Sequence, residues 1–450
     1  MAGRTAAVPD RRGTRGQSGR AAVSGRRLFL FWGRCRSTSQ GGAVIDYWRR
    51  KVMLVQKKSS PLGRIATPAL AGALALSMAG AAQADVTLYQ GDGKIPSVIG
   101  YVRVDAGLRF GTDVDLAQYN GGQAGKTTTL MQAAGNDWGT SMFGLHGTAQ
   151  LTPDLAAIYR IESGFDATKG TFNSSTNSIF NRRAYGGLSN PKLGSIYFGK
   201  DLFINNDVYN FDPMIQENMS TPTLVYGRNW PGASDMIEYR SPNWGGLQIG
   251  AQASFGNGDT SMSTKLSNMY GVSVQYDYKI LSLFGIYDEI QDKNGHYTNL
   301  YSASREGIVG ATLDLKPVKL FVGFEQLDAP DGTREKGGSP IHNPGATYFP
   351  YAPVYATSAN MTWVGAAIQA TPDLLFRTGW YRTSVNHQGG NANLVTGGVE
   401  YSLSKNVMVY FTLGEVINSG QANFSADVYA PPPAPGKNQF GGFNGISIQF

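Results

Sequence analysis

The chain has 450 residues, 41% of them hydrophobic, with 58 Gly, 21 Pro, a single Cys and a formal net charge of +7. Residues 1–84 carry 15 Lys and Arg against 2 Asp and Glu, whereas residues 85–450 carry 24 basic and 30 acidic side chains, a net charge of −6. The basic character belongs to the N-terminal segment, so the body of the chain loses the main support for a nucleic-acid partner.

Residues 53–84 have the pattern of a secretory signal peptide. Three basic residues precede an Ala- and Leu-rich stretch at 65–78, and Ala-Gln-Ala at 82–84 is a small-residue cleavage site. We predict cleavage between Ala84 and Asp85. A retained membrane anchor is the weaker alternative, because the apolar stretch is short and contains a proline.

Residues 1–52 are rich in Arg and poor in acidic side chains, which superficially fits a mitochondrial presequence. We favour an upstream leader read from a wrongly chosen start, with Met53 as the initiator, because a signal peptide works at the N-terminus. The only cysteine, Cys35, lies in this leader. The mature chain, 85–450, would therefore have no disulfide, thiolate metal site or thiol nucleophile.

Side chains alternate with period two in segments of roughly 9–13 residues after position 85, separated by breaks rich in Gly, Asn, Asp and Pro. Three clear apolar sets are Val272/Val274/Tyr276/Tyr278, Leu247/Ile249/Ala251/Ala253/Phe255 and Val407/Val409/Phe411/Leu413. None of these sets contains a charge, and a Lys or Arg facing lipid at the bilayer midplane costs roughly 2–4 kcal/mol. Lipid outside and water inside a transmembrane β-barrel explain this pattern; a soluble two-sheet sandwich is the alternative.

Sixteen candidate strands can be counted, and an even number is typical of a single-chain bacterial barrel. They are 97–110, 138–151, 155–166, 179–189, 193–201, 234–241, 246–256, 268–280, 281–291, 303–315, 318–328, 357–370, 373–385, 392–403, 406–418 and 440–450. Short turns alternate with long connections at 111–137, 167–178, 202–233, 329–356 and 419–439. The sequence therefore predicts an antiparallel up-and-down barrel with short turns at one end and long loops at the other.

Several stretches resemble the general trimeric porins of Gram-negative outer membranes. They are 141–148 (SMFGLHGT), 155–165 (LAAIYRIESGF), 181–189 (NRRAYGGLS) with 194–200 (GSIYFGK), 237–247 (IEYRSPNWGGL) and the C-terminal 446–450 (ISIQF). The resemblance covers essentially the whole mature chain. It implies a homotrimer in the outer membrane, in contact with lipid and lipopolysaccharide, that lets ions and small hydrophilic solutes diffuse passively.

The resemblance also implies a constriction, which we expect the long segment 202–233 to form by folding inward. The matching motifs place Arg103, Arg182, Lys200 and Arg240 on its basic side, and the loop would bring Asp207, Asp212 and Glu217 opposite them. Lys200 shares parity with Ile196 and Phe198, so it reaches the lumen only if a bulge at Gly199 shifts the alternation. Phe450 is the C-terminal aromatic typical of barrel assembly in this family.

Chemistry other than transport has little support. The four His residues, His146, His296, His342 and His387, form no metal-ligand or Ser–His pattern, so we predict no enzyme, cofactor or metal. Two alternatives stay open: a barrel used for adhesion or surface interaction through its long loops, and an outer-membrane lipid hydrolase. Conductance in planar bilayers and phospholipid turnover would separate them from a porin.

Overall fold

The computed structural model describes residues 85–92, 95–116, 126–173, 178–255, 269–332, 356–387 and 389–450. The predicted leader at 1–52, the signal peptide at 53–84 with Ala84, and most of the long connection 329–356 lie outside the described residues. No helix within the described part of the chain is long and apolar enough to cross a membrane.

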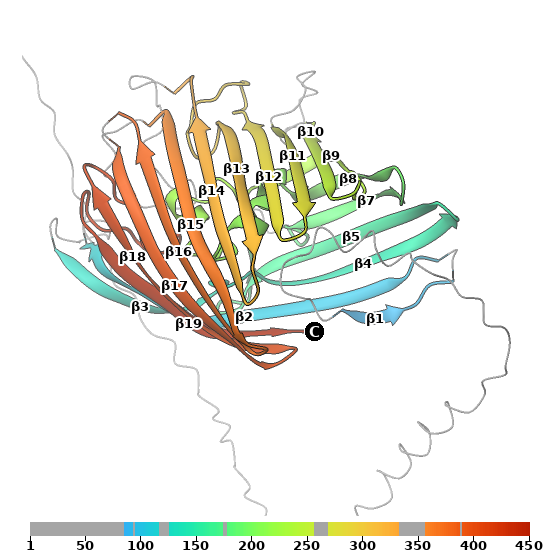
Figure 1. Cartoon of the computed structure of the whole chain (residues 1–450), viewed down its shortest axis with the longest axis horizontal. Helices are drawn as coiled ribbons and strands as arrows, with labels where there is room; N and C mark the ends of the chain where they lie inside the picture. Colours follow the sequence, from blue (N-terminus) through green and yellow to red (C-terminus); the bar gives the residue numbers. More distant parts are fainter. Residues whose placement is uncertain are drawn as a thin grey trace, which may run out of the picture. The chain divides into compact units, whose positions relative to one another are not determined.

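Strands account for almost all of the regular structure (Figure 1). They are β1 (Val86–Tyr89), β2 (Val98–Asp115), β3 (Thr127–Gly135), β4 (Ser141–Thr152), β5 (Leu155–Asp166), β6 (Thr171–Phe172), β7 (Arg183–Asn190), β8 (Gly194–Leu202), β9 (Gly232–Arg240), β10 (Leu247–Ser254), β11 (Met269–Tyr278), β12 (Leu281–Ile290), β13 (Arg305–Asp314), β14 (Val318–Asp328), β15 (Ser358–Thr371), β16 (Leu374–Val385), β17 (Gly390–Ser404), β18 (Val407–Ser419) and β19 (Gln439–Gln449). Two short helices, η2 (Ile204–Phe211) and α2 (Thr221–Leu224), lie between β8 and β9.

Sixteen of these strands close into one antiparallel ring. The ring runs β2–β4–β5–β7–β8–β9 and then through β10 to β19, which pairs with β2 again. Each of the sixteen ring strands therefore has a partner on both sides, the condition for a sheet that spans a membrane. All sixteen predicted segments correspond to strands of this ring, so the predicted barrel is confirmed.

Burial alternates along the strands as period two requires. On β11, Val272 and Val274 are 52% and 44% exposed, whereas Gly271 of the same strand is buried. On β18, Phe411 is 44% exposed while Tyr410 and Thr412 are 4% and 1% exposed. The outward face of the ring is therefore apolar, and the buried side chains lie inside.

The second wall strand of the ring is interrupted, which corrects the predicted 111–137 loop. β3 pairs with residues 106–115 of β2, and β4 pairs with residues 99–103 of the same strand. Residues 136–140 separate β3 from β4 and carry Asp137 and Trp138, which are only 1% and 5% exposed. The interruption therefore places an acidic and an aromatic side chain inside the barrel.

The seam of the barrel involves both ends of the described chain. The Phe450 amide donates to the Val102 carbonyl at 2.9 Å, just beyond β19, and Val86 of β1 pairs with Gly100. Phe450 is 51% exposed. β19 and β1 therefore follow one another along the same edge of β2, with one ladder position, opposite Tyr101, between Phe450 and Val86.

Candidate functional site: an inner loop and a guanidinium wall

The connection between β8 and β9, residues 203–231, folds into the barrel; we call it the inner loop. Its apolar side chains Phe203, Ile204, Val208, Met214 and Met219 are all at most 1% exposed. η2 contacts strands β10 to β14, and α2 contacts β16. The inner loop therefore rests against the β10–β16 part of the wall.

Side chains of β15 and β16 hold the middle of the inner loop. The Trp363 indole Nε1 donates to the Phe211 carbonyl at 2.9 Å, and the Tyr381 hydroxyl donates to the Asp212 carboxylate at 2.6 Å. Arg377 donates to the Pro213 carbonyl at 3.2 Å. These three contacts fix consecutive residues, so the backbone around Asp212 has one position relative to the wall.

Arg228 anchors the end of the inner loop. Its guanidinium lies 2.7 Å from Asp288 of β12 and 3.2 Å from Glu306 of β13, with all three side chains fully buried. Burial by itself lowers the pKa of Arg228, but the two carboxylates outweigh it and raise the pKa. The arginine is therefore charged, and it compensates carboxylates that would otherwise be buried without a counter-charge.

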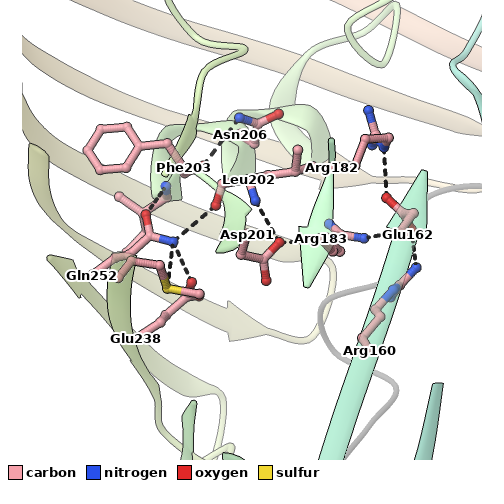
Figure 2. A network of polar contacts seen from close by, with 12 residues as sticks. Arg160, Glu162, Arg182, Arg183, Asp201, Leu202, Phe203, Asn206, Glu238 and Gln252 are labelled. Atoms are coloured by element: carbon pink, nitrogen blue, oxygen red, sulfur yellow. Dashed lines mark hydrogen bonds and ion pairs between the residues drawn. The ribbon is translucent and has the colours of Figure 1, made fainter. Parts of the chain in front are cut away.

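Arginines gather on the strands opposite this attachment. Figure 2 shows three guanidinium groups converging on Glu162 of β5: Arg160 at 2.7 Å, Arg182 at 2.7 Å and Arg183 at 3.4 Å. Arg183 also lies 2.7 Å from Asp201 of β8. We call Arg103, Arg160, Arg182 and Arg183 the guanidinium wall; the side chains of Arg182 and Arg183 are 21% and 19% exposed.

Arg103 belongs to this wall but is held differently. Its Nε donates to the Thr140 carbonyl at 2.8 Å, and its guanidinium carbon lies 5.7 Å from the centre of the Trp138 ring. Among the described residues, no carboxylate lies within ion-pair distance of Arg103. The strand interruption at 136–140 therefore positions a guanidinium whose charge is not compensated by direct pairing.

Two of the predicted constriction residues meet each other directly. Arg240 of β9 forms an ion pair with Asp207 of η2, and their side chains are 29% and 37% exposed. Ser273 of β11 donates to the same Asp207 carboxylate at 3.1 Å, and Arg240 also lies 2.5 Å from Glu238. This side of the lumen thus has one guanidinium between two carboxylates.

Asp212 and Glu217 do not face the lumen but attach the inner loop to itself and to the wall. Asp212 is 0% exposed and also accepts hydrogen bonds from the Thr221 amide at 3.0 Å and the Met214 amide at 2.9 Å. Glu217 is 2% exposed and accepts from the Thr412 hydroxyl at 3.0 Å. Burial, and then the nearby Glu400, raise the pKa of Glu217.

Lys200 lies on the outward face. The β8–β9 register shifts between Gly199 and Asp201, but the extra residue is on β9, so β8 keeps its alternation. Lys200 therefore shares a face with Ile196 and Phe198, which are 37% and 56% exposed, and its Nζ lies 2.9 Å from the Ser234 hydroxyl. The bulge that would turn Lys200 inward is not on its strand.

The sequence interpretation missed several functional contacts. Arg160 and Arg183 could have been found from strand parity, since each shares the inward parity of a neighbouring polar residue. Arg228 carried no such signal, because it lies in a loop and its partners are far along the chain. Within the described residues, no group of three or more His, Cys, Asp or Glu is placed to hold a metal ion.

Comparison with known proteins agrees with this architecture. A family model described as Gram-negative porin matches residues 69–421. An outer membrane porin protein of Bordetella pertussis is 26% identical over 374 residues, covering 76% of this chain and 91% of that protein.

Two solved structures have the same fold. The anion-selective porin from Comamonas acidovorans is 20% identical, with a TM-score of 0.63 over 79% of this chain and 100% of its own. The trimer form of OmpT, an outer membrane protein of Vibrio cholerae, is 12% identical, with a TM-score of 0.53 over 79% of this chain and 100% of its own. The closed sixteen-strand barrel and the family match together show that this chain belongs to the Gram-negative porin family and is a diffusion channel of the outer membrane rather than an enzyme.

Proposed function

We propose that the inner loop and the guanidinium wall form the charged constriction of a water-filled pore, and that this constriction favours small anions and anionic hydrophilic solutes. The main observation that supports the proposal is an excess of positive charge on the guanidinium wall. Three guanidinium groups share two carboxylates, Glu162 and Asp201, and Arg103 adds a fourth. Rings of Arg select for anions in pores.

The attachment of the inner loop supports a position for the opening. Because η2 and α2 rest on β10–β14 and β16, we infer that solutes pass between the inner loop and the guanidinium wall. Asp207 lies on the loop side, where two carboxylates flank Arg240. Opposite charge on the two sides creates a transverse field, which orients polar solutes and disfavours apolar ones.

Reversal potentials in planar bilayers under a salt gradient test this proposal. We expect the unmodified protein to favour anions, and replacement of Arg103 and Arg182 by Gln to shift the reversal potential toward cations. Lys200→Gln is the matched control, because it removes one positive charge from the outward face and should leave selectivity unchanged. A pore that favours cations, or an R103Q/R182Q variant with wild-type selectivity, would overturn the proposal.

We further propose that the protein assembles as a homotrimer surrounded by outer-membrane lipid and lipopolysaccharide. The large exposed side chains of the outward face, such as Val272, Val309 and Phe198, support a surface that contacts hydrocarbon or another copy. The OmpT relative is described in a trimer form. Light scattering of the detergent-solubilised protein should give three chains per particle; one chain per particle would refute the trimer.

Processing between Ala84 and Asp85 is also proposed. The Asp85 carboxylate lies 3.3 Å from His146, and Val86 enters the β2 ladder at the next residue. A mature chain that starts at Asp85 keeps both contacts. The mass of the intact protein purified from membranes should match residues 85–450, and a mass that includes any part of 53–84 would exclude this site.

A further inference from the structure

The connection between β18 and β19, residues 420–438, corresponds to the predicted long connection 419–439, yet much of it is enclosed by the chain; we call it the last loop. Residues 422–428 are all buried, and Phe424 is 0% exposed. Asp427 in the same run is also 0% exposed. Loops that extend into solvent do not bury a continuous run of side chains, so the last loop is folded against other parts of the molecule.

The surface that it covers is the inner loop. The Phe424 ring stacks on the Tyr226 ring with centroids 4.8 Å apart and planes 20° apart, and Tyr429 stacks on Trp230 at 5.8 Å. The Val428 amide donates to the Asn218 carbonyl at 3.0 Å. Aromatic stacking and a main-chain hydrogen bond thus join two loops that are about 200 residues apart in the sequence.

A polar junction connects both loops to the barrel wall. The guanidinium of Arg109, on β2, forms an ion pair with Asp137 and lies 3.1 Å from Asp427. Asn218 of the inner loop donates to the same Asp137 carboxylate at 2.8 Å. One buried arginine therefore ties together the wall, the strand interruption, the inner loop and the last loop.

Side chains at the ends of β18 and β19 set the inward course of the last loop. The Asn418 amide nitrogen donates to the Phe424 and Lys437 carbonyls at 2.9 and 2.8 Å, and the Phe424 amide donates back to Asn418. Gln439 accepts from the Ala426 amide at 2.9 Å and donates to the Pro431 carbonyl at 2.9 Å. The course of the loop is built into inward-facing residues of the adjoining strands.

We propose that the last loop is a second constriction element, which lies on the inner loop and limits the size of the solutes that reach the guanidinium wall. The inference rests on the proposed pore. The last loop adds Phe424 and its buried neighbours to the surface of the inner loop. The size limit of the pore then depends on both loops.

The test replaces residues 421–437 by a short Gly-Asn turn and compares single-channel conductance and liposome swelling by sugars of increasing size with the unmodified protein. We expect a higher conductance and a shift of the size limit to larger sugars. A second variant, Asn418→Ala with Phe424→Ala, keeps the loop length and should shift both quantities in the same direction. Lys437→Ala, an exposed side chain of the same loop, is the control and should change neither.

The outcomes separate this inference from the proposed pore. A shortened protein that migrates as a folded barrel and conducts like the wild type overturns the role of the last loop, while the diffusion pore stands. An unmodified protein that conducts no ions overturns the pore itself. Higher conductance in both variants, with unchanged preference for anions, supports a size-limiting element that is separate from the charged wall.

Discussion

Arg228 decides on which side of the barrel the inner loop lies. It comes from the loop, yet its side chain is 0% exposed and its ionic partners are on β12 and β13. Its Nε also donates to the Ser304 hydroxyl at 2.9 Å. An arginine with this many fixed partners gives the loop directional anchoring that apolar contacts alone would not provide.

Removal of this arginine should be costly. Arg228→Ala leaves Asp288 and Glu306 buried without a counter-charge, and breaking a buried ion pair from one side costs roughly 3–5 kcal/mol. When samples are heated before electrophoresis, we expect the faster-migrating band of the folded barrel to disappear at a markedly lower temperature for this variant than for the wild type.

Arg305→Ala is the matched control for that experiment. Arg305 is 44% exposed and lies 3.7 Å from Glu289, so its removal should change the free energy of unfolding by only about 0–1 kcal/mol. Equal losses in the two variants would contradict the anchoring role of Arg228.

For single residues, the sequence predicted the orientation of side chains on strands better than that of side chains in loops. Alternation with the neighbours Ile237 and Tyr239 agrees with the inward position of Arg240 that the family motif implied. Asp212 and Glu217 have no such reference, since loop residues follow no period. Their positions depend on Tyr381 and Thr412, partners about 170 and 195 residues away, which a local pattern cannot reveal.

Among the strands, β15 has a glycine at the point where the inner loop packs against it. Gly365 faces the loop, and a β-carbon at this position would lie 2.5 Å from the Pro213 side chain and 2.4 Å from the Thr378 carbonyl. Both distances are shorter than any real contact of this kind. The absence of a side chain at Gly365 therefore allows the inner loop to approach the wall.

Gly365→Val should push the inner loop away from β15 and toward the guanidinium wall. Because the proposed opening lies on that side, we expect a lower single-channel conductance than in the wild type. Gly307→Ala is the control, since a β-carbon there meets no atom within 4 Å. A normal conductance in a folded G365V protein would show that the loop does not move into the opening.

The docking of the last loop should depend on pH. Burial raises the pKa of Asp427 from 3.8 to about 7; the attraction of Arg109 opposes this rise, and repulsion from Asp137 adds to it. The Tyr429 ring also borders Arg109, and the inner loop contributes only the neutral Asn218 to this junction. The docked loop therefore holds a proton on Asp427 that the free loop would release.

The direction of the pH effect follows from this difference in the pKa of Asp427 between the docked and the free loop. Docking takes up a proton, so it is favoured below pH 4 and weakens between pH 4 and 7 by up to about 1.4 kcal/mol per pH unit. We expect conductance to be lower at pH 5 than at pH 8. Asp427→Asn should remove most of this difference, and a variant that keeps it would assign the pH dependence to other groups.

For the whole molecule, the sequence predicted the architecture almost completely. All sixteen wall segments were found, because a strand with lipid on one face and the barrel interior on the other repeats its pattern every two residues. The interruption at 136–140 and the inward course of the last loop were not found. Both depend on contacts such as Arg109 with Asp137 and Asp427, which join distant segments and leave no local signature.

Closure of the barrel should depend on its last residue. Phe450 exchanges two main-chain hydrogen bonds with Val102, and each contributes roughly 0.5–1.5 kcal/mol. Deletion of Phe450 should lower the fraction of folded barrel recovered from outer membranes. Phe450→Tyr keeps both the main-chain bonds and the C-terminal aromatic and serves as the control; recovery of the deletion variant at the wild-type level would assign the residue no part in closure.

The seam between β19 and β2 has one more consequence. Phe450 lies opposite Val102 and Val86 opposite Gly100, so the single ladder position between them is the one that Asp85 occupies. If processing occurs at the proposed site, the two ends of the mature chain occupy adjacent ladder positions along β2. A permuted gene that joins Phe450 to Asp85 and begins at the β17–β18 turn would encode the same barrel, in which the starting point of translation is arbitrary.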